Sequence, residues 1–163
     1  VCLFLTCEEA AAFEEKVYEH RVLIKNKVNI FGNQLIVDAN DQVIGEDPYY
    51  LPNATTLSLE EAYDLATSMG GVCHPAHVDR PSNGLIAILG DVPEHPAYRF
   101  AEFNDPANIE PYREKYPRFR DMKVIYGSDA HRPDAVPEEA VFSIEVDDEG
   151  TPAEAVFRYL KGE

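Results

Sequence analysis

Short apolar runs alternate along the chain with longer stretches in which hydrophobic positions recur at helical spacing. The apolar run at residues 1–5 is typical of a short buried strand. Thr6 follows as a plausible N-cap, with Glu8 and Glu9 in a first turn where the helix dipole favours acids. The helix predicted from this cap runs to about His20. Its apolar stripe consists of Ala10, Phe13 and Val17.

The same two patterns predict the remaining elements. Apolar runs at 35–37 and 42–44 flank a polar turn and indicate a hairpin. Ser58 and Glu61 form a capping box that opens a helix, and Gly70 and Gly71 end it. The further predicted strands are 72–76, 98–103, 122–126 and 140–146, and the further helices are 83–89, 109–116 and one that begins at Pro152 after Thr151.

Strands that alternate with helices in this way predict an α/β architecture with parallel strands. The length of 163 residues fits a single domain. Hydrophobic residues make up 45% of the chain, which is enough to bury a core and argues against wholesale disorder.

The charge of the chain limits the classes of partner that it can bind. Against 14 Lys and Arg stand 30 Asp and Glu, a formal net charge of −16. Such an excess of acid argues against a broad electrostatic grip on nucleic acid and against docking on anionic membranes. No apolar run approaches the ~20 residues that span a bilayer. Three cysteines, Cys2, Cys7 and Cys73, lack metal-binding spacing and indicate a reducing, cytoplasmic compartment.

Candidate chemistry gathers where two of the predicted strands end. The segment 73–80 includes His77 and the segment 127–131 includes Asp129 and His131. In parallel α/β folds, ligands collect outside the carboxyl ends of the strands. We therefore expect the two segments to open on the same face of the sheet.

Asp129 and His131 are two residues apart, a spacing that puts both side chains on one side of an extended backbone. A carboxylate beside an imidazole suits a divalent transition metal such as Zn, Mn or Fe. The alternative is that Asp129 caps the next turn and His131 is merely exposed.

His77 is the third candidate ligand, and its alternative is a histidine held by a hydrogen bond at a strand end. Alternation puts Cys73, Pro75 and His77 on one side of the strand, so His74 is a packing or surface histidine. Arg80 follows closely, and its guanidinium fork suits a phosphate group. The alternative for Arg80 is a solvent-exposed loop position.

Three more polar residues lie near predicted strand ends: Asp79, Glu102 and Asn104. Glu102 stands between Ala101 and Phe103, so its side chain can point into the site while its neighbours face helices. For all three we favour a supporting or solvent-facing role over direct metal ligation.

Two of these segments resemble motifs of a known family. Gly70-Gly71-Val72 leads into Pro75-Ala76-His77-Val78-Asp79-Arg80, which resembles the late histidine motif of the PHP family, the polymerase and histidinol phosphatase domains. Gly127-Ser128-Asp129-Ala130-His131 resembles the closing metal motif of that family, G-S-D-A-H. Residues 1–13 are similar to the stretch that follows a Glu and a His ligand in bacterial members. The resemblance covers essentially the whole chain.

The resemblance implies a distorted barrel of about seven parallel strand–helix units, with metals held at the strand C-termini. Residue by residue, it makes His77, Asp129 and His131 metal ligands, and it puts Arg80 where a basic residue meets the substrate phosphate. Sites of this kind hydrolyse phosphate esters with a metal-activated water. The implied substrates are a small phosphorylated molecule or a short nucleotide end.

The chain also departs from the family. The family opens with a His-x-His strand and supplies further His and Glu ligands before the position of Val1, and this sequence contains no His-x-His. We therefore expect residues 1–163 to be a single PHP-like domain that forms the C-terminal portion of a longer chain, a partial distorted (β/α)7 barrel that lacks its N-terminal strands.

Two functions follow as expectations. The first is a metal-dependent phosphoesterase of which this chain holds a partial metal site, so that it is inactive or much weakened alone. The second is a non-catalytic, truncated domain with a structural or interaction role. Exposed sheet edges would favour a homo-oligomer in either case.

Overall fold

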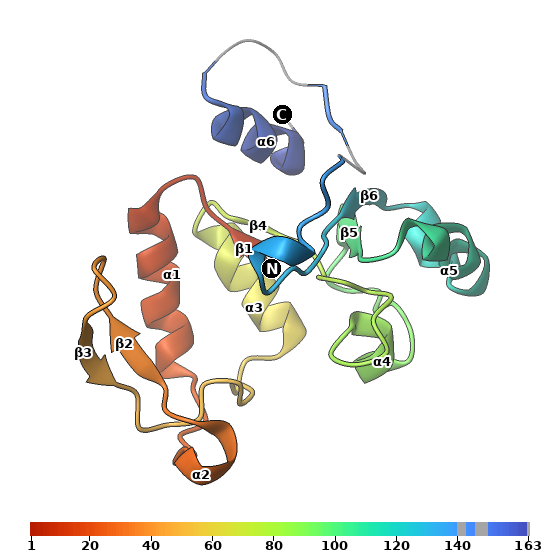
Figure 1. The fold of residues 1–163 in the computed structure, drawn as a ribbon. Helices are drawn as coiled ribbons and strands as arrows, with labels where there is room; N and C mark the ends of the chain where they lie inside the picture. Colours follow the sequence, from red (N-terminus) through yellow and green to blue (C-terminus); the bar gives the residue numbers. More distant parts are fainter. Residues whose placement is uncertain (140–142, 146–149, 163) are drawn as a thin grey trace.

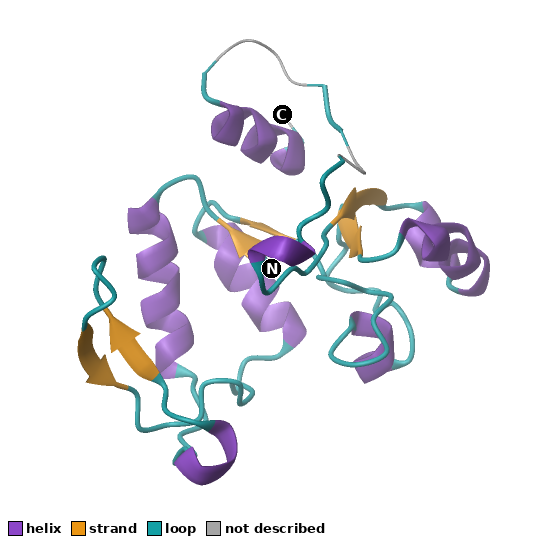
Figure 2. Ribbon diagram, in the orientation of Figure 1, coloured by secondary structure: helices purple, strands orange, loops and turns teal. Residues whose placement is uncertain are grey.

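The computed structural model describes residues 1–139, 143–145 and 150–162 (Figures 1 and 2). The helices are α1 (Cys7–Glu19), α2 (Val28–Phe31), α3 (Leu59–Ser68), α4 (Leu85–Leu89), α5 (Ile109–Lys115) and α6 (Pro152–Lys161). The strands are β1 (Cys2–Leu3), β2 (Leu35–Val37), β3 (Val43–Glu46), β4 (Val72–Cys73), β5 (Phe100–Phe103) and β6 (Lys123–Tyr126). In Figure 1 the β2–β3 hairpin and α2 occupy one end of the molecule and α5 the other.

The helix starts predicted from capping residues are confirmed. The side chain of each of the three caps accepts a hydrogen bond from the main-chain N–H of the Glu three residues later. The carboxylate of that Glu accepts a hydrogen bond from the main-chain N–H of the cap. The pairs are Thr6 with Glu9, Ser58 with Glu61 and Thr151 with Glu154. The hairpin is confirmed as well, since β2 and β3 pair antiparallel around a turn in which Asp41 has a φ of 59°.

The described strands form three two-stranded sheets. The parallel arrangement predicted from the alternation of elements holds for β5 and β6, which pair from Phe100 with Lys123 to Phe103 with Tyr126. It is wrong for β1 and β4, which pair antiparallel. The reason is local, because Val1 and His74 exchange two main-chain hydrogen bonds of 2.9 and 3.1 Å, as only antiparallel partners do.

The strand expected at 72–76 ends at Cys73, because Pro75 has no N–H to continue a ladder. The chain beyond it still runs beside β5. The N–H of Glu102 donates to the carbonyl of Pro75 at 3.1 Å, and the N–H of Val78 donates to the carbonyl of Glu102 at 2.9 Å. The segment that carries His77 is therefore fixed to the same strand as Glu102. The strand expected at 140–146 falls largely outside the described residues.

The hydrophobic core lies in the second half of the chain, around β5 and β6. Its buried residues are Val78, Leu85, Val92, Tyr98, Ala101, Phe103, Phe119 and Met122. The α6 helix adds Tyr159, whose ring centroid lies 5.4 Å from that of Phe100. Because this core surrounds β5 and β6, it fixes the ends of the two strands that carry Glu102, Asn104 and the 127–131 segment.

The run at residues 1–5, expected to be buried, is not. Val1, Leu3 and Leu5 are 51%, 37% and 48% exposed. Within the described residues only β4 pairs with β1, so one edge of this short strand has no partner. The predicted stripe of α1 is only partly covered, because Phe13 and Val17 are half-buried and Ala10 is exposed.

Candidate functional site

The loop that follows β6 is held against the end of β5. The side-chain amide of Asn104 donates to the carbonyls of Gly127 and Ser128 at 3.0 and 2.9 Å. A Cβ on Gly127 would lie 2.5 Å from Cδ of Glu102, so any other residue at 127 would displace the Glu102 side chain. Asn104 and Gly127 together set the position from which the chain continues to Asp129.

Asp79 fixes the other side of the same loop region. Its buried carboxylate accepts hydrogen bonds from the main-chain N–H groups of Asn104 and Asp105, at 2.8 and 3.0 Å, and from the amide of Asn108 at 2.9 Å. Burial favours the neutral acid, but these N–H donors outweigh it and lower the pKa of Asp79. Asp79 therefore orders residues 104–108 by accepting hydrogen bonds from uncharged N–H groups.

Three of the predicted site residues meet at this edge. The guanidinium of Arg80 forms an ion pair with Oδ2 of Asp129, and Nε2 of His131 lies 3.2 Å from Oδ1 of the same carboxylate. The Asp129 side chain is 21% exposed, Arg80 39% and His131 83%. A cation, a carboxylate and an imidazole from two separate strand ends thus share one partly exposed cluster.

Of the alternative to a functional role, one part agrees with the structure, since His131 is largely exposed, and the other does not, since Asp129 does not cap the following turn. The short 3-10 helix Pro133–Ala135 has Arg132 as its N-cap, with no side-chain cap bond. Asp129 instead has a φ of 51°, a left-handed conformation that is uncommon for a residue with a side chain. The backbone there turns the carboxylate toward Arg80 and His131.

His77 also has a positive φ, of 31°. Its main-chain N–H donates to Oε1 of Glu102 at 3.2 Å. Its ring Nδ1 is buried and has no hydrogen-bond partner among the described residues, so the alternative of a ring held by a hydrogen bond at this nitrogen is not what the structure shows. An unpaired imidazole nitrogen in a buried position is costly unless another group satisfies it.

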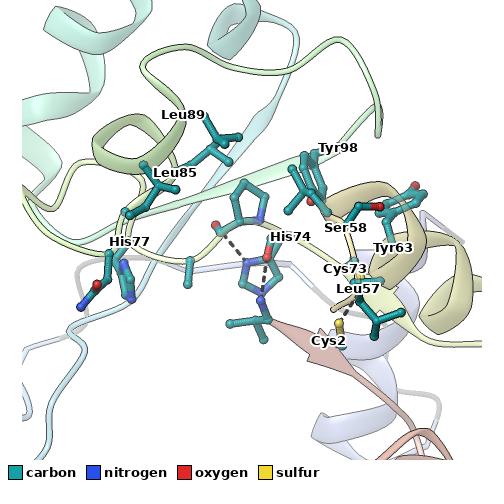
Figure 3. A pocket seen from close by; sticks show the side chains of 18 residues that line it. Cys2, Leu57, Ser58, Tyr63, Cys73, His74, His77, Leu85, Leu89 and Tyr98 are labelled. Carbon is teal, nitrogen blue, oxygen red and sulfur yellow. Dashed lines mark hydrogen bonds between the residues drawn. The ribbon is translucent and has the colours of Figure 1, made fainter. Parts of the chain in front are cut away.

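The His77 ring lines a cavity of about 470 Å³ (Figure 3). Its wall is largely apolar and includes Leu57, Leu85, Leu89 and Tyr98. Figure 3 shows His77 toward one end of the cavity and Cys2 and Cys73 toward the other.

His74 is a packing histidine, in agreement with one of the two roles predicted for it. Its side chain is only 5% exposed, and Nδ1 lies 3.4 Å from the carbonyl of Pro75 and 3.9 Å from Oε2 of Glu102. Burial, with the charge of the Val1 amino group, lowers its pKa and favours the neutral imidazole. His74 also lines the cavity, because the expected alternation of sides stops where β4 ends.

The donor set has the chemistry of a divalent metal site, since it offers two imidazoles and one carboxylate, and the buried Nδ1 of His77 lacks a partner. Asp129 and His131 lie together, whereas His77 does not join them. In the part of the chain that the structure describes, no group of three or more His, Cys, Asp or Glu side chains is arranged to hold a metal ion.

Two contacts in and near the site have no clear signal in the sequence. One is the close approach of Glu102 to Gly127, which depends on the register of β5 and β6. The other is the contact between the thiols of Cys2 and Cys73, which are 71 residues apart in sequence. In each case the pairing of the two strands would have to be known before the contact could be predicted.

Comparisons with protein-family models, with curated proteins and with solved structures each give no match. The resemblance to the PHP family therefore rests on the motifs quoted above and stays a prediction. None of the helices in the described residues has the length and apolar content needed to cross a membrane.

Proposed function

We propose that this chain carries part of the site of a metal-dependent phosphoesterase of the PHP type, at the ends of β5, β6 and the segment after β4. The observation that carries the proposal is the meeting of Arg80, Asp129 and His131, which come from two motifs 49 positions apart. An anion-binding fork next to metal-type donors is a combination that suits phosphate ester hydrolysis.

His77, Asp129 and His131 are the residues that would hold a divalent cation such as Zn, Mn or Fe. When bound, such a cation supplies a water of lowered pKa and neutralises charge on the phosphoryl oxygens. The backbone of the chain prepares Asp129 for this role, because its left-handed conformation directs the carboxylate toward His131. With three donors, the chain provides a partial set compared with the family it resembles.

Arg80 is the residue that would bind the phosphate group of the substrate. Within the described residues the guanidinium of Arg80 forms an ion pair with Asp129, and the Arg80 side chain is 39% exposed. A phosphate ester dianion presents the same fork-matching oxygens as a carboxylate. Arg80 can therefore exchange Asp129 for substrate, a small phosphorylated molecule or a short nucleotide end, and so free the carboxylate.

Asp79, Glu102 and Asn104 position these groups without contacting the substrate. Glu102 holds the main chain of His77, Asn104 holds the loop before Asp129, and Asp79 holds Asn104. Partners that orient metal ligands typically change metal affinity or activity by about 10–100-fold when they are removed. Loss of Asn104 is therefore expected to weaken the site and leave the core intact.

The proposal is tested by phosphate binding and by hydrolysis of an aryl phosphate in the presence of Mn²⁺ or Zn²⁺. Arg80→Ala should weaken inorganic phosphate binding by about 10-fold or more, because a charge-assisted pair is lost. Arg118→Ala, at a 47% exposed position beside Glu94, is the matched control and should bind phosphate normally. Any hydrolysis above background should require the metal and disappear in Asp129→Ala. Equal phosphate affinity in Arg80→Ala and the unchanged protein would reject the proposed role of Arg80.

A second candidate function is a non-catalytic interaction role, and the β2–β3 hairpin favours it. Five apolar side chains of this hairpin are about half exposed or more: Leu35, Ile36, Val37, Val43 and Ile44. Apolar residues gathered on a small exposed sheet are typical of interaction surfaces. Sedimentation of the chain and of Ile44→Lys distinguishes this role, since a dimer that dissociates in Ile44→Lys and survives Asp129→Ala supports it. A monomer at all concentrations contradicts self-association.

A further inference from the structure

Cys2 and Cys73 stand directly opposite each other in the β1–β4 ladder. Their Sγ atoms are 3.0 Å apart. The neighbouring pair, Val1 and His74, exchanges the main-chain hydrogen bonds, so Cys2 and Cys73 are the non-hydrogen-bonded pair. Such pairs bring the Cα atoms to about 4.5 Å, at the short end of the range that a disulfide spans.

We propose that Cys2 and Cys73 form a reversible disulfide, a redox modification site that ties β1 to β4 at the edge of the 470 Å³ cavity. This site is independent of the proposed phosphoesterase function, because it uses none of the residues in that site. In a reducing compartment such a bond is transient and responds to oxidation.

Access and reactivity support this assignment. Both thiols are half-buried and line the open cavity, so a small oxidant can reach them, whereas Cys7 is exposed at the start of α1. The hydrogen bond between the two thiols lowers the pKa of Cys2 to about 7, against the effect of burial. The hydrogen bond and burial raise the pKa of Cys73. Cys2 is therefore the attacking thiol and Cys73 the resolving one.

The oxidant is a low-molecular-weight disulfide such as oxidised glutathione. The Cys2 thiolate attacks one sulfur of that disulfide, its S–S bond breaks, and one glutathione leaves as a thiolate that takes up a proton. Cys73 then gives up its proton and attacks Sγ of Cys2 in the mixed disulfide, and the second glutathione leaves as a thiol. The protein dithiol is oxidised to a disulfide, and the glutathione disulfide is reduced to two thiols.

The test is oxidation of the folded Cys7→Ser variant with oxidised glutathione, followed by tryptic mapping. In this variant the peptide of residues 1–16 contains Cys2 as its single cysteine. The peptide of residues 28–99, in which the bond between Arg80 and Pro81 resists trypsin, contains Cys73. We expect these two peptides to become cross-linked, both free thiols to disappear, and dithiothreitol to restore them. The cross-link should raise the apparent Tm by about 5–15 °C, because it closes a long loop.

Two further variants distinguish the roles of the two thiols. Cys73→Ser with Cys7→Ser should accumulate the glutathione adduct on Cys2, since no resolving thiol remains. Cys2→Ser with Cys7→Ser should react more slowly, because burial still raises the pKa of Cys73 after the contributions of Cys2 are lost. The proposal is overturned if the folded Cys7→Ser protein gives separate glutathione adducts on both cysteines without a cross-link. It is also overturned if neither thiol reacts at concentrations that modify Cys7 in the unchanged chain.

Discussion

The first 58 residues and the following 70 are held together in different ways. Within residues 1–58, all of which the structure describes, Asp47 is the only buried residue, and large apolar side chains such as Ile30 and Ile44 are 63% and 67% exposed. Residues 59–128 contain the core around Phe103 and Phe119. The first region depends on local caps and polar contacts, whereas the second also buries apolar surface.

The two buried acids show the same contrast. Asp47 accepts hydrogen bonds from the Arg21 guanidinium at 3.0 Å, from the Tyr18 hydroxyl at 2.8 Å and from the Tyr49 N–H at 2.8 Å, so it is neutralised by a charge. Asp79 accepts from neutral amide groups only. Asp47 therefore joins distant loops through an ion pair, whereas Asp79 orders the strand ends where the candidate site lies.

The largest expected difference between the regions is in the cost of removing an aromatic ring. Phe103→Ala should lower the free energy of unfolding by about 3–5 kcal/mol, because the ring is fully buried and leaves a cavity. Phe31→Ala, at a 52% exposed position, should cost about 1 kcal/mol or less. Urea unfolding of both variants measures the difference. Equal costs would mean that the first region buries its aromatic residues as well as the second does.

A smaller effect is expected from the acid that orders the strand ends. Asp79→Asn should cost about 1–3 kcal/mol, since an amide NH2 would face N–H donors that now bind a carboxylate oxygen. Asp121→Asn, at an exposed position, is the matched control and should leave stability nearly unchanged. Thermal unfolding reports the cost, and amide exchange at Asn104 and Asp105 should increase in the Asp79 variant alone.

The contribution of Asp47, the buried acid of the first region, should appear in the dependence of stability on pH. The Arg21 guanidinium, together with the Tyr49 N–H, lowers the pKa of Asp47 from 3.8 to about 2. A carboxyl whose pKa is lower in the folded protein stabilises it above the unfolded pKa, and this stabilisation is lost as pH falls toward the folded value. Stability should therefore fall between about pH 4 and pH 2, and part of that fall should be absent in Asp47→Asn. Urea midpoints across this range measure it, and identical pH profiles would rule out the ion pair as its source.

The sequence is informative where the structure depends on neighbours along the chain. Ser58 could be recognised as a cap from the box that Glu61 completes, Thr6 from the acids in the first turn, and Thr151 from Pro152 at the first helical position. The β2–β3 hairpin follows from the turn between its strands. The antiparallel pairing of β1 with β4 could not be predicted, because these strands are about 70 residues apart and the periodicity of each fits either direction.

The same limit applies to the candidate site. Motif order and strand ends were enough to predict that Arg80 and Asp129 would lie on one face, and the structure brings them into contact. The motifs could not predict that Arg80 would form an ion pair with Asp129, the carboxylate expected to bind metal. Nor could they predict that Asp79 would accept hydrogen bonds from three N–H groups. These outcomes depend on the conformation of loops after the strands, where Asp129 and His77 adopt positive φ angles.

Metal binding is the most direct test of the proposed function, and the first region supplies its control. The chain is dialysed against Zn²⁺ or Mn²⁺, and its bound metal is quantified by mass spectrometry. The variants His77→Ala and Asp129→Ala are measured in the same way. The control is His20→Ala in the first region, where His20 is exposed and hydrogen-bonded to Thr56. We expect stoichiometric metal in the unchanged chain and in His20→Ala, and its loss in His77→Ala and Asp129→Ala. Equal metal content in all four proteins, or none in the unchanged chain, would contradict the assignment of the site.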